Sequence, residues 1–258
     1  MELPISGLLC KSAESALYLA IKACGVGPGD YLLAPDLGST DLAGALRRTG
    51  VLPLLFDVDP GCWLADLDLL EEFLMGNTML NDADQLVMRR DGKAIKGIVI
   101  VHLNGNPADM DRLRFICDRF LLPLIEDATE SVAAMFRSKP VGTFGETAAC
   151  SLSRHPVGYA TAAGLLLAKD EACFHRAQAC GEMLDPHERP IPVQPGEVLH
   201  LPHETGEMPR EYILQEHLRE VPAIRFQKVH PLARQYSGAI ALETEAAPEL
   251  HAFLEQHQ

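Results

Sequence analysis

Two apolar segments of this sequence each lead into side chains that can do chemistry. The run 121–125 ends at Glu126 and Asp127, and the run 148–152 is followed closely by His155. In open α/β sheets, ligands bind beyond the carboxyl ends of the strands. We therefore expect the two strand ends to face one shared crevice that could hold a ligand.

The elements that must position these residues alternate in type along the first 180 residues. Helical spacing of apolar residues, with Ser12 as an N-cap of the first helix, alternates with short apolar runs. Such alternation predicts an α/β fold of parallel strands with right-handed crossovers. Helices are expected at 12–24, 39–49, 66–74, from Asn106-Pro107 onward and at 171–180; strands at 31–34, 51–56, 97–103, 121–125 and 165–168. The segment 75–93 is expected to be polar and irregular.

The last 75 residues differ from the rest. We divide the chain into a large domain at 1–183, a proline-rich linker at 184–209 and a short α/β remnant at 210–258. The linker holds six prolines, which exclude a regular helix or a central strand. His200 and His203 have the spacing of metal ligands on a helix, but a proline lies between them, so no metal site is expected.

Composition limits the classes of partner. The 258 residues carry a formal net charge of −14, which argues against a nucleic-acid partner because phosphate binding needs a basic surface. No apolar run is long enough to span a bilayer, and the first ten residues lack the features of a signal peptide, so no membrane association is expected. Seven cysteines without a Cys-x-x-Cys pair indicate reduced thiols and a cytoplasmic protein.

Several short motifs follow one another in an order that resembles a known family. They are Ser-Ala-Glu-Ser-Ala-Leu (12–17), Gly-Val-Gly-Pro-Gly-Asp (25–30), Phe-Asp-Val-Asp-Pro (56–60), Val-His-Leu-Asn-Gly-Asn-Pro-Ala-Asp-Met (101–110), Ile-Glu-Asp-Ala (125–128) and Val-Gly-Thr-Phe-Gly (141–145). Together they resemble the large domain of the DegT/DnrJ/StrS-type sugar aminotransferases over residues 8–180. The resemblance implies the three-layer α/β/α architecture of fold-type-I enzymes that use pyridoxal phosphate (PLP), a nucleotide-sugar ligand and a homodimer that shares its sites across the interface.

The resemblance also implies a cofactor, PLP or its amine form PMP, and roles for single positions. Asp127 occupies the place of the carboxylate that pairs with the ring nitrogen, which keeps such a cofactor an electron sink. Ser151 occupies the place of a serine that helps to hold the phosphate. His102 falls at a histidine position, and we expect it to be a packing residue or one that supports a neighbouring residue of the site. Asp127 could equally be a hydrogen-bonded structural carboxylate, and Ser151 a locally satisfied serine.

Other cofactor positions depart from the family pattern. At the start of the first helix Ala13 and Glu14 replace glycine and threonine, so a carboxylate stands where helix N–H groups would grip phosphate. A carboxylate about 4 Å from a phosphate costs about 4 kcal/mol per charge pair at an effective dielectric of about 20. Glu130 replaces a glutamine, and Ser39 or a neighbour falls where an aromatic residue would stack on the ring. The simpler reading of Glu14 is a first-turn acid that stabilises its own helix.

The largest departure concerns the lysine that forms the Schiff base in the family. No lysine occurs from Cys150 to Ala168, and the lysine position falls on Pro156, with His155 beside it. Without an amine, transamination loses its covalent step. The family's N-terminal segment and most of its C-terminal domain are also missing, so the sequence resembles a degenerate and truncated member.

Three hypotheses follow. The first is an aminotransferase-like protein of sugar-nucleotide or cell-surface polysaccharide metabolism that lacks transaminase activity. The second is a PLP- or PMP-dependent sugar dehydratase or lyase with His155 as its proton-transfer base. The third is an active transaminase with a displaced lysine, either Lys139 or Lys169.

Overall fold

The chain folds around one large mixed sheet. The computed structural model describes residues 6–132, 134–152, 163–193 and 224–226, and within them nine strands form this sheet. They are β1 (Gly7–Cys10), β2 (Tyr31–Pro35), β3 (Leu52–Phe56), β6 (Ile95–Val101), β7 (Leu124–Ala128), β10 (Thr147–Ser151), β11 (Gly164–Ala168), β12 (Ile191–Val193) and β13 (Ile224–Phe226). Their order is β12-β1-β11-β10-β7-β6-β2-β3-β13.

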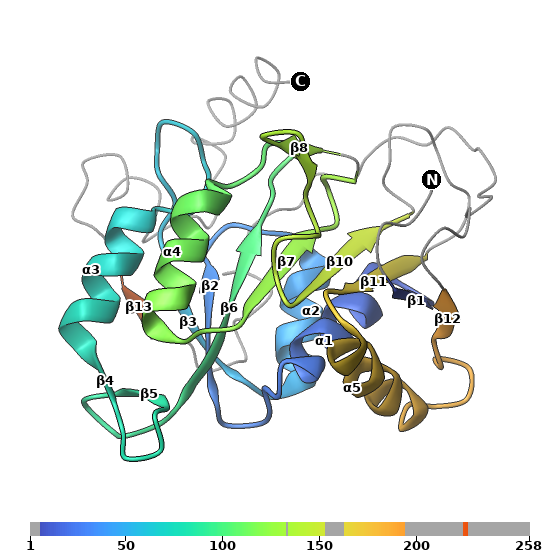
Figure 1. Ribbon diagram of the computed structural model, residues 1–258, viewed down its shortest axis with the longest axis horizontal. Coiled ribbons are helices and arrows are strands. Elements are labelled where there is room, and N and C mark those ends of the chain that lie inside the picture. The colour runs from blue at the N-terminus through green and yellow to red at the C-terminus, as the bar shows by residue number, and fades with distance from the viewer. Residues whose placement is uncertain (1–5, 133, 153–162, 194–223, 227–258) are drawn as a thin grey trace, which may run out of the picture.

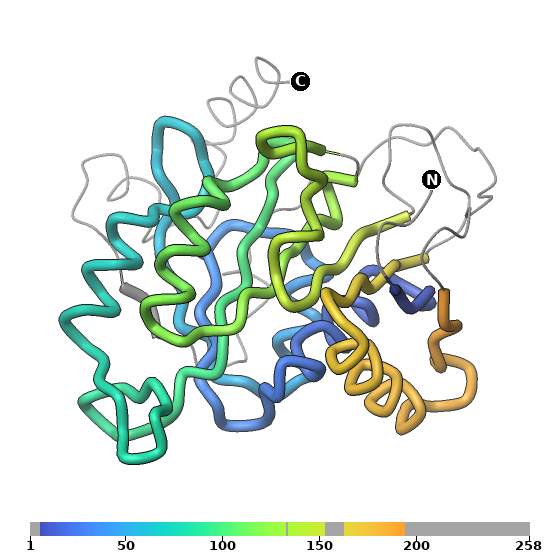
Figure 2. Tube along the Cα trace, in the orientation of Figure 1, coloured from blue at the N-terminus to red at the C-terminus, as the bar shows by residue number. Residues whose placement is uncertain are grey.

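Most of these strands run parallel. The strands from β10 through β7, β6, β2 and β3 to β13 pair in parallel, whereas β11, β1 and β12 extend the sheet as antiparallel strands. Figure 2 shows β1, at the start of the chain, beside β11 and β12 near residues 164–193.

The predicted α/β fold with a mainly parallel sheet is confirmed. The strand predicted at 165–168, β11, is antiparallel to both of its neighbours.

Within the described ranges, five helices cover the two faces of the sheet. They are α1 (Ala13–Ala23), α2 (Thr40–Thr49), α3 (Leu67–Asn77), α4 (Met110–Phe120) and α5 (Glu171–Glu182). One buried cluster joins α1, α2 and α5 to the sheet, and a second joins α3 and α4 to it. Figure 1 shows α3 and α4 grouped together, apart from α1, α2 and α5. This is the predicted three-layer architecture.

Each of these helices starts at a side chain that accepts a hydrogen bond from the first turn. The caps are Ser12, Ser39, Asp66, Asp109 and Asp170. Such caps satisfy N–H groups that have no partner within the helix. The predicted cap Asn106 is wrong for α4: Asn106 forms a bridge to Leu103, and Asp109 accepts the N–H of Arg112 at 3.2 Å instead.

Some elements were not predicted. The segment expected to be irregular contains a hairpin of β4 (Thr78–Leu80) and β5 (Leu86–Met88), and a second hairpin joins β8 (Met135–Phe136) to β9 (Lys139–Pro140). β12 lies in the range predicted as a linker and pairs with the main sheet. β13 falls within 223–227, where the sequence suggested a strand of the remnant, and it also pairs with the main sheet. The division of the chain into three domains stays a prediction.

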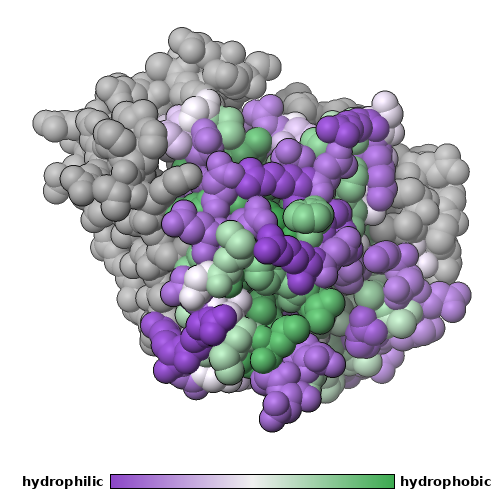
Figure 3. Space-filling model, turned by 60° about the vertical axis from the view of Figure 1, so that its left-hand side comes forward, coloured by the Kyte–Doolittle hydropathy of each residue, from purple (hydrophilic) through white to green (hydrophobic). Residues whose placement is uncertain are grey.

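The outer face of α3 and α4 is held by ion pairs. Arg112 pairs with Asp68 and Glu71, and Arg119 pairs with Glu71 at 2.6 Å. Figure 3, turned to bring the α3 side forward, shows hydrophilic residues interspersed with smaller apolar areas. None of the helices in the described ranges is long and apolar enough to cross a bilayer.

A close backbone approach fixes α1 against the sheet. A Cβ atom on Gly164 would lie 2.2 Å from the carbonyl oxygen of Ser12 and 2.8 Å from the amide nitrogen of Ala13. Because both atoms belong to the backbone, neither can move without shifting the helix or the strand. Glycine at 164 therefore permits the contact between β11 and the start of α1.

We expect Gly164→Ala to lower the free energy of unfolding by at least about 2 kcal/mol, because the added methyl group overpacks this contact. Gly76→Ala, in α3, is the matched control: its Cβ meets nothing within 4 Å, and alanine in a helix should raise stability by up to about 1 kcal/mol. Urea denaturation measures both changes. Equal midpoints for the wild type and Gly164→Ala would contradict this account of the packing.

Candidate functional site

Asp127 lies near the carboxyl end of β7, with its side chain 1% exposed. Its Oδ1 atom accepts two hydrogen bonds from Thr129, one from the backbone N–H at 3.0 Å and one from the hydroxyl at 2.6 Å. Its Oδ2 atom receives one long contact, 3.5 Å from the hydroxyl of Ser39, among the described residues. The two oxygens are therefore unequally satisfied.

The surroundings of Asp127 favour its protonated form. Burial raises the pKa of this carboxyl, the hydrogen bonds from Thr129 oppose the rise, and the negative charge of Asp41 adds to it. A cationic donor beside Oδ2 would favour the ionised form, as a protonated ring nitrogen would. Asp127 is therefore the described side chain best placed to pair with a positively charged ligand atom.

Glu126 faces the other side of the sheet, because successive residues of a strand point to opposite faces. Its side chain is fully buried and accepts the backbone N–H groups of Gly142 at 2.7 Å, Phe144 at 2.7 Å and Gly145 at 2.6 Å. Of the two carboxylates at this strand end, Glu126 is therefore the one that points away from Asp127. Its role is to tie the loop before β10 to β7.

The fourth partner of Glu126 is His102, which is also fully buried. The Nδ1 atom of His102 accepts the backbone N–H of Ala108 at 3.2 Å, so the ring proton lies on Nε2 and is donated to Glu126 at 3.0 Å. Burial pushes the pKa of Glu126 upward, but the hydrogen bonds from His102, Gly145 and Gly142 outweigh it and hold the pKa below its ordinary value. The structure thus places His102 as a packing residue, as expected.

The start of α1 lies beside the end of β10. Ser151, 1% exposed, is the last residue of β10 and pairs with Gly164 of β11, which contacts Ser12 and Ala13. The structure thus brings together Ala13 and Ser151, two residues that the sequence assigned to one phosphate position. The antiparallel strand β11 makes this contact, and nothing in the periodicity of the sequence indicated it.

Glu14 adds a carboxylate at this helix start. A Cβ on Gly44, in α2, would lie 2.5 Å from Oε2 of Glu14 and 2.6 Å from its Cδ atom. The half-buried Glu14 side chain therefore lies across Gly44 and fills the place of a side chain there. α2 also begins at Ser39, which contacts Asp127, so this helix links the Glu14 carboxylate to the Asp127 end of the site.

The remaining predicted residues fall in different places. Glu130 is half-buried and follows Thr129, the residue that binds Asp127. Ser39, which falls where the family has an aromatic residue, is buried, and its hydroxyl caps α2. His155 lies outside the described residues, as do His200 and His203. Among the residues that the structure describes, no cluster of histidine, cysteine and carboxylate side chains could hold a metal ion.

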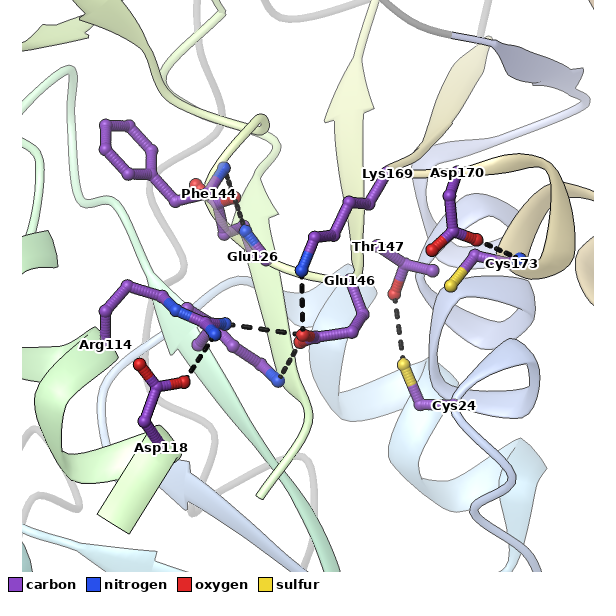
Figure 4. A network of polar contacts seen from close by, with 12 residues as sticks. Cys24, Arg114, Asp118, Glu126, Phe144, Glu146, Thr147, Lys169, Asp170 and Cys173 are labelled. Carbon is purple, nitrogen blue, oxygen red and sulfur yellow. Dashed lines mark hydrogen bonds and ion pairs between the residues drawn. The ribbon is translucent and has the colours of Figure 1, made fainter. Parts of the chain in front are cut away.

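The two candidate lysines have partners of their own. The ammonium group of Lys169 lies 3.5 Å from Oε1 of Glu146, which also faces Arg114, at the amino ends of β7 and β10 (Figure 4). Asp127 lies toward the other end of β7. The ammonium group of Lys139 lies 4.3 Å from the centre of the Phe144 ring.

These residues fit only part of the implied cofactor. Asp127 is a suitable partner for a protonated ring nitrogen, being buried with an oxygen that can accept a strong bond. The phosphate end does not fit, because Glu14 adds a carboxylate to the first turn of α1, where the phosphate would lie. No step of a PLP-dependent reaction is therefore assigned to these residues.

We expect Glu126→Gln to lower the free energy of unfolding by about 3 kcal/mol at neutral pH, because an amide cannot accept all four buried donors. The difference from the wild type should shrink in acid. A carboxyl with a lowered folded pKa stabilises above its unfolded pKa, and this stabilisation is lost as pH falls through the folded pKa. Urea denaturation across the acid range measures this, and a difference that does not depend on pH would contradict it.

The contact between Glu14 and Gly44 can be tested by a double-mutant cycle. Gly44→Ala in a Glu14→Ala background should raise stability by about 0.5–1 kcal/mol through helix propensity. In the wild type this gain should vanish, because the new Cβ displaces the Glu14 side chain. We expect a coupling energy of at least about 0.5 kcal/mol from denaturation of the four proteins. Additive effects would show that the two residues do not touch.

Comparison with known proteins supports the assignment of the fold. GDP-perosamine synthase of Caulobacter vibrioides is 30% identical over 183 residues, which cover 70% of this chain and 45% of that protein. A DegT DnrJ EryC1 StrS aminotransferase structure from Brucella abortus matches with a TM-score of 0.60 at 23% identity, covering 74% of this chain and 48% of that one. The E. coli GDP-4-keto-6-deoxy-D-mannose-3-dehydratase with bound hydrated PLP matches with a TM-score of 0.54 at 25% identity, covering 66% and 41%.

The chain thus spans less than half of each of these relatives. The model of the DegT/DnrJ/EryC1/StrS aminotransferase family matches residues 6–183, the range that holds α1, Asp127 and Ser151. This match takes in more than half of the sequence, and the chain therefore belongs to the DegT/DnrJ/EryC1/StrS aminotransferase family.

Proposed function

We propose that this chain is an aminotransferase-fold protein of sugar-nucleotide metabolism that does not carry out transamination. One observation carries the proposal: no lysine occurs from Cys150 to Ala168, the stretch in which the family places its Schiff-base lysine. An amino-group transfer through PLP needs a protein amine that binds and releases the cofactor. Arg154 is the cationic residue of this stretch, and its guanidinium does not act as a nucleophile at neutral pH.

The positions of the other lysines support the proposal. Lys169 is bound to Glu146 at the amino ends of β7 and β10, and Lys139 stacks on Phe144 in a hairpin. To act at the Asp127 end of the site, either ammonium group would have to leave these partners. A displaced lysine is therefore the weakest of the three hypotheses.

The second hypothesis, a dehydratase or lyase, keeps one observation in its favour. His155 directly precedes the position of the missing lysine, and the chain matches a solved sugar dehydratase at 25% identity. An imidazole near neutral pH can take and return a proton without forming a covalent bond to the cofactor. In such a protein Asp127 would hold a ring nitrogen while His155 moved the proton.

Substrate, assembly and location are parts of the same proposal. A nucleotide-linked sugar, in the synthesis of cell-surface polysaccharide, is supported by the 30% identity to GDP-perosamine synthase. A homodimer follows from the family resemblance, and light scattering would reveal it. A cytoplasmic location is supported by the seven cysteines, all of which are free.

The proposal predicts that no lysine becomes labelled in the site. The purified protein is incubated with PLP, reduced with borohydride and digested, and mass spectrometry locates any cofactor-bearing lysine. We expect no stoichiometric label, and no amino transfer from a donor to a keto sugar nucleotide. Lys139→Arg and Lys169→Arg serve as matched variants, because each keeps the positive charge and removes the reactive amine.

One stoichiometric label that disappears in one of these two variants would overturn the proposal and establish a displaced lysine. The histidine hypothesis has its own readout. PMP retained after desalting by the wild type, and lost in His155→Ala, would favour a dehydratase or lyase over a protein without catalysis.

A further inference from the structure

We propose that Glu14 makes the site at the start of α1 and Asp127 selective against phosphate, so that it takes ring ligands with a cationic nitrogen and no phosphate group. The inference rests on the proposed function, in that it concerns the same Asp127 carboxyl. It adds the chemical class of the ligand and names the residue that determines it.

The start of a helix ordinarily attracts anions. The first N–H groups of α1 have no partner within the helix, and the helix dipole places partial positive charge there. Ser151 lies at the same point through its pairing with Gly164, which contacts Ser12 and Ala13. The backbone therefore has the arrangement of an anion site, formed by a helix start and a strand end.

Glu14 supplies an anion from the chain itself. The side chain lies against Gly44, at distances that leave no room for a methyl group on α2. It is half-buried, and no hydrogen bond or ion pair joins it to another described residue. A carboxylate that has no cationic partner among the described residues repels a second anion, and the repulsion is greater in a partly buried site than in water.

Gly44 provides the space that the Glu14 side chain fills. An alanine there would have its Cβ 2.5 Å from Oε2 and 2.6 Å from Cδ of Glu14. Glycine in a helix interior lowers the stability of the fold relative to alanine. The Glu14 side chain packed against position 44 explains why the smaller residue stands there. Glycine at 44 thus leaves room for the Glu14 side chain against α2.

The Asp127 end of the site favours a cation. Oδ2 of the buried Asp127 carboxyl receives only the long contact from Ser39 among the described residues, which leaves room for a stronger donor. A protonated ring nitrogen suits this oxygen. The combination selects a ligand that is positive at one end and uncharged at the other.

The experiment compares two probes that differ only in the phosphate group, pyridoxamine and PMP. Equilibrium dialysis with coenzyme absorbance measures both affinities, and the fluorescence of Trp63, the one tryptophan of the chain, gives an independent signal. The variants are Glu14→Gln, which keeps the shape and removes the charge, and Glu171→Gln, which removes a first-turn charge from α5. Circular dichroism and urea denaturation confirm that each variant is folded.

We expect the wild type to bind pyridoxamine at least as tightly as PMP. Glu14→Gln should raise the association constant for PMP by at least about tenfold, which equals about 1.4 kcal/mol, with little change for pyridoxamine. Glu171→Gln should alter neither affinity. The gain for PMP should decrease at high ionic strength, since it is electrostatic.

Three results would overturn the inference: tighter binding of PMP than of pyridoxamine by the wild type, an unchanged affinity ratio in Glu14→Gln, or no binding of either probe by any of the proteins. These outcomes can be told apart from failure of the proposed function, which would appear as a lysine labelled by PLP. Both probes are amines that cannot form a Schiff base with a lysine, so the ratio of their affinities does not depend on whether PLP labels a lysine.

Discussion

The alternation of side chains along β7 places two neighbouring carboxylates on opposite faces of the sheet, and the rest of the site follows from that separation. Glu126 enters a set of four donors that holds it ionised, with a lowered pKa. Asp127 faces α2 with fewer donors, and burial raises its pKa. The two adjacent carboxyl groups thus have pKa values shifted in opposite directions, because their surroundings differ. Glu126 stabilises the strand ends on which the ligand-facing residue depends.

The close approach of three backbone segments completes the site. Gly164 lets β11 contact the start of α1, and Gly44 leaves space on α2 for the side chain that α1 carries there. Gly164 therefore sets the distance between the start of α1 and the sheet, because its contacts are with backbone atoms, whereas Gly44 makes room for a side chain of α1. Under our proposal, Glu14 determines the charge that a ligand may carry at the start of α1.

The elements were predictable where local signals were strong. Ser12 as a cap and the alternation of helices with apolar runs led to α1 and the parallel strands, and the order of motifs led to the family. The direction of Glu126 could have been derived from the period of two along a strand. The contact between Glu14 and Gly44 could not, because it joins positions thirty residues apart through tertiary packing. The hairpin of β4 and β5 was missed because its strands have only three residues each, too few for a clear alternation, and the turn between them is polar.

The raised pKa of Asp127 bears on why this residue is buried at all. A carboxyl whose folded pKa lies above its unfolded value lowers the stability of the folded state as pH rises between the two. A scaffold under no other constraint would gain by replacing it with an apolar residue. A cationic ligand reverses the sign, since it pairs with the ionised form and restores the stability that burial removes. A ligand that is positive where it meets β7 would therefore account for the burial of Asp127.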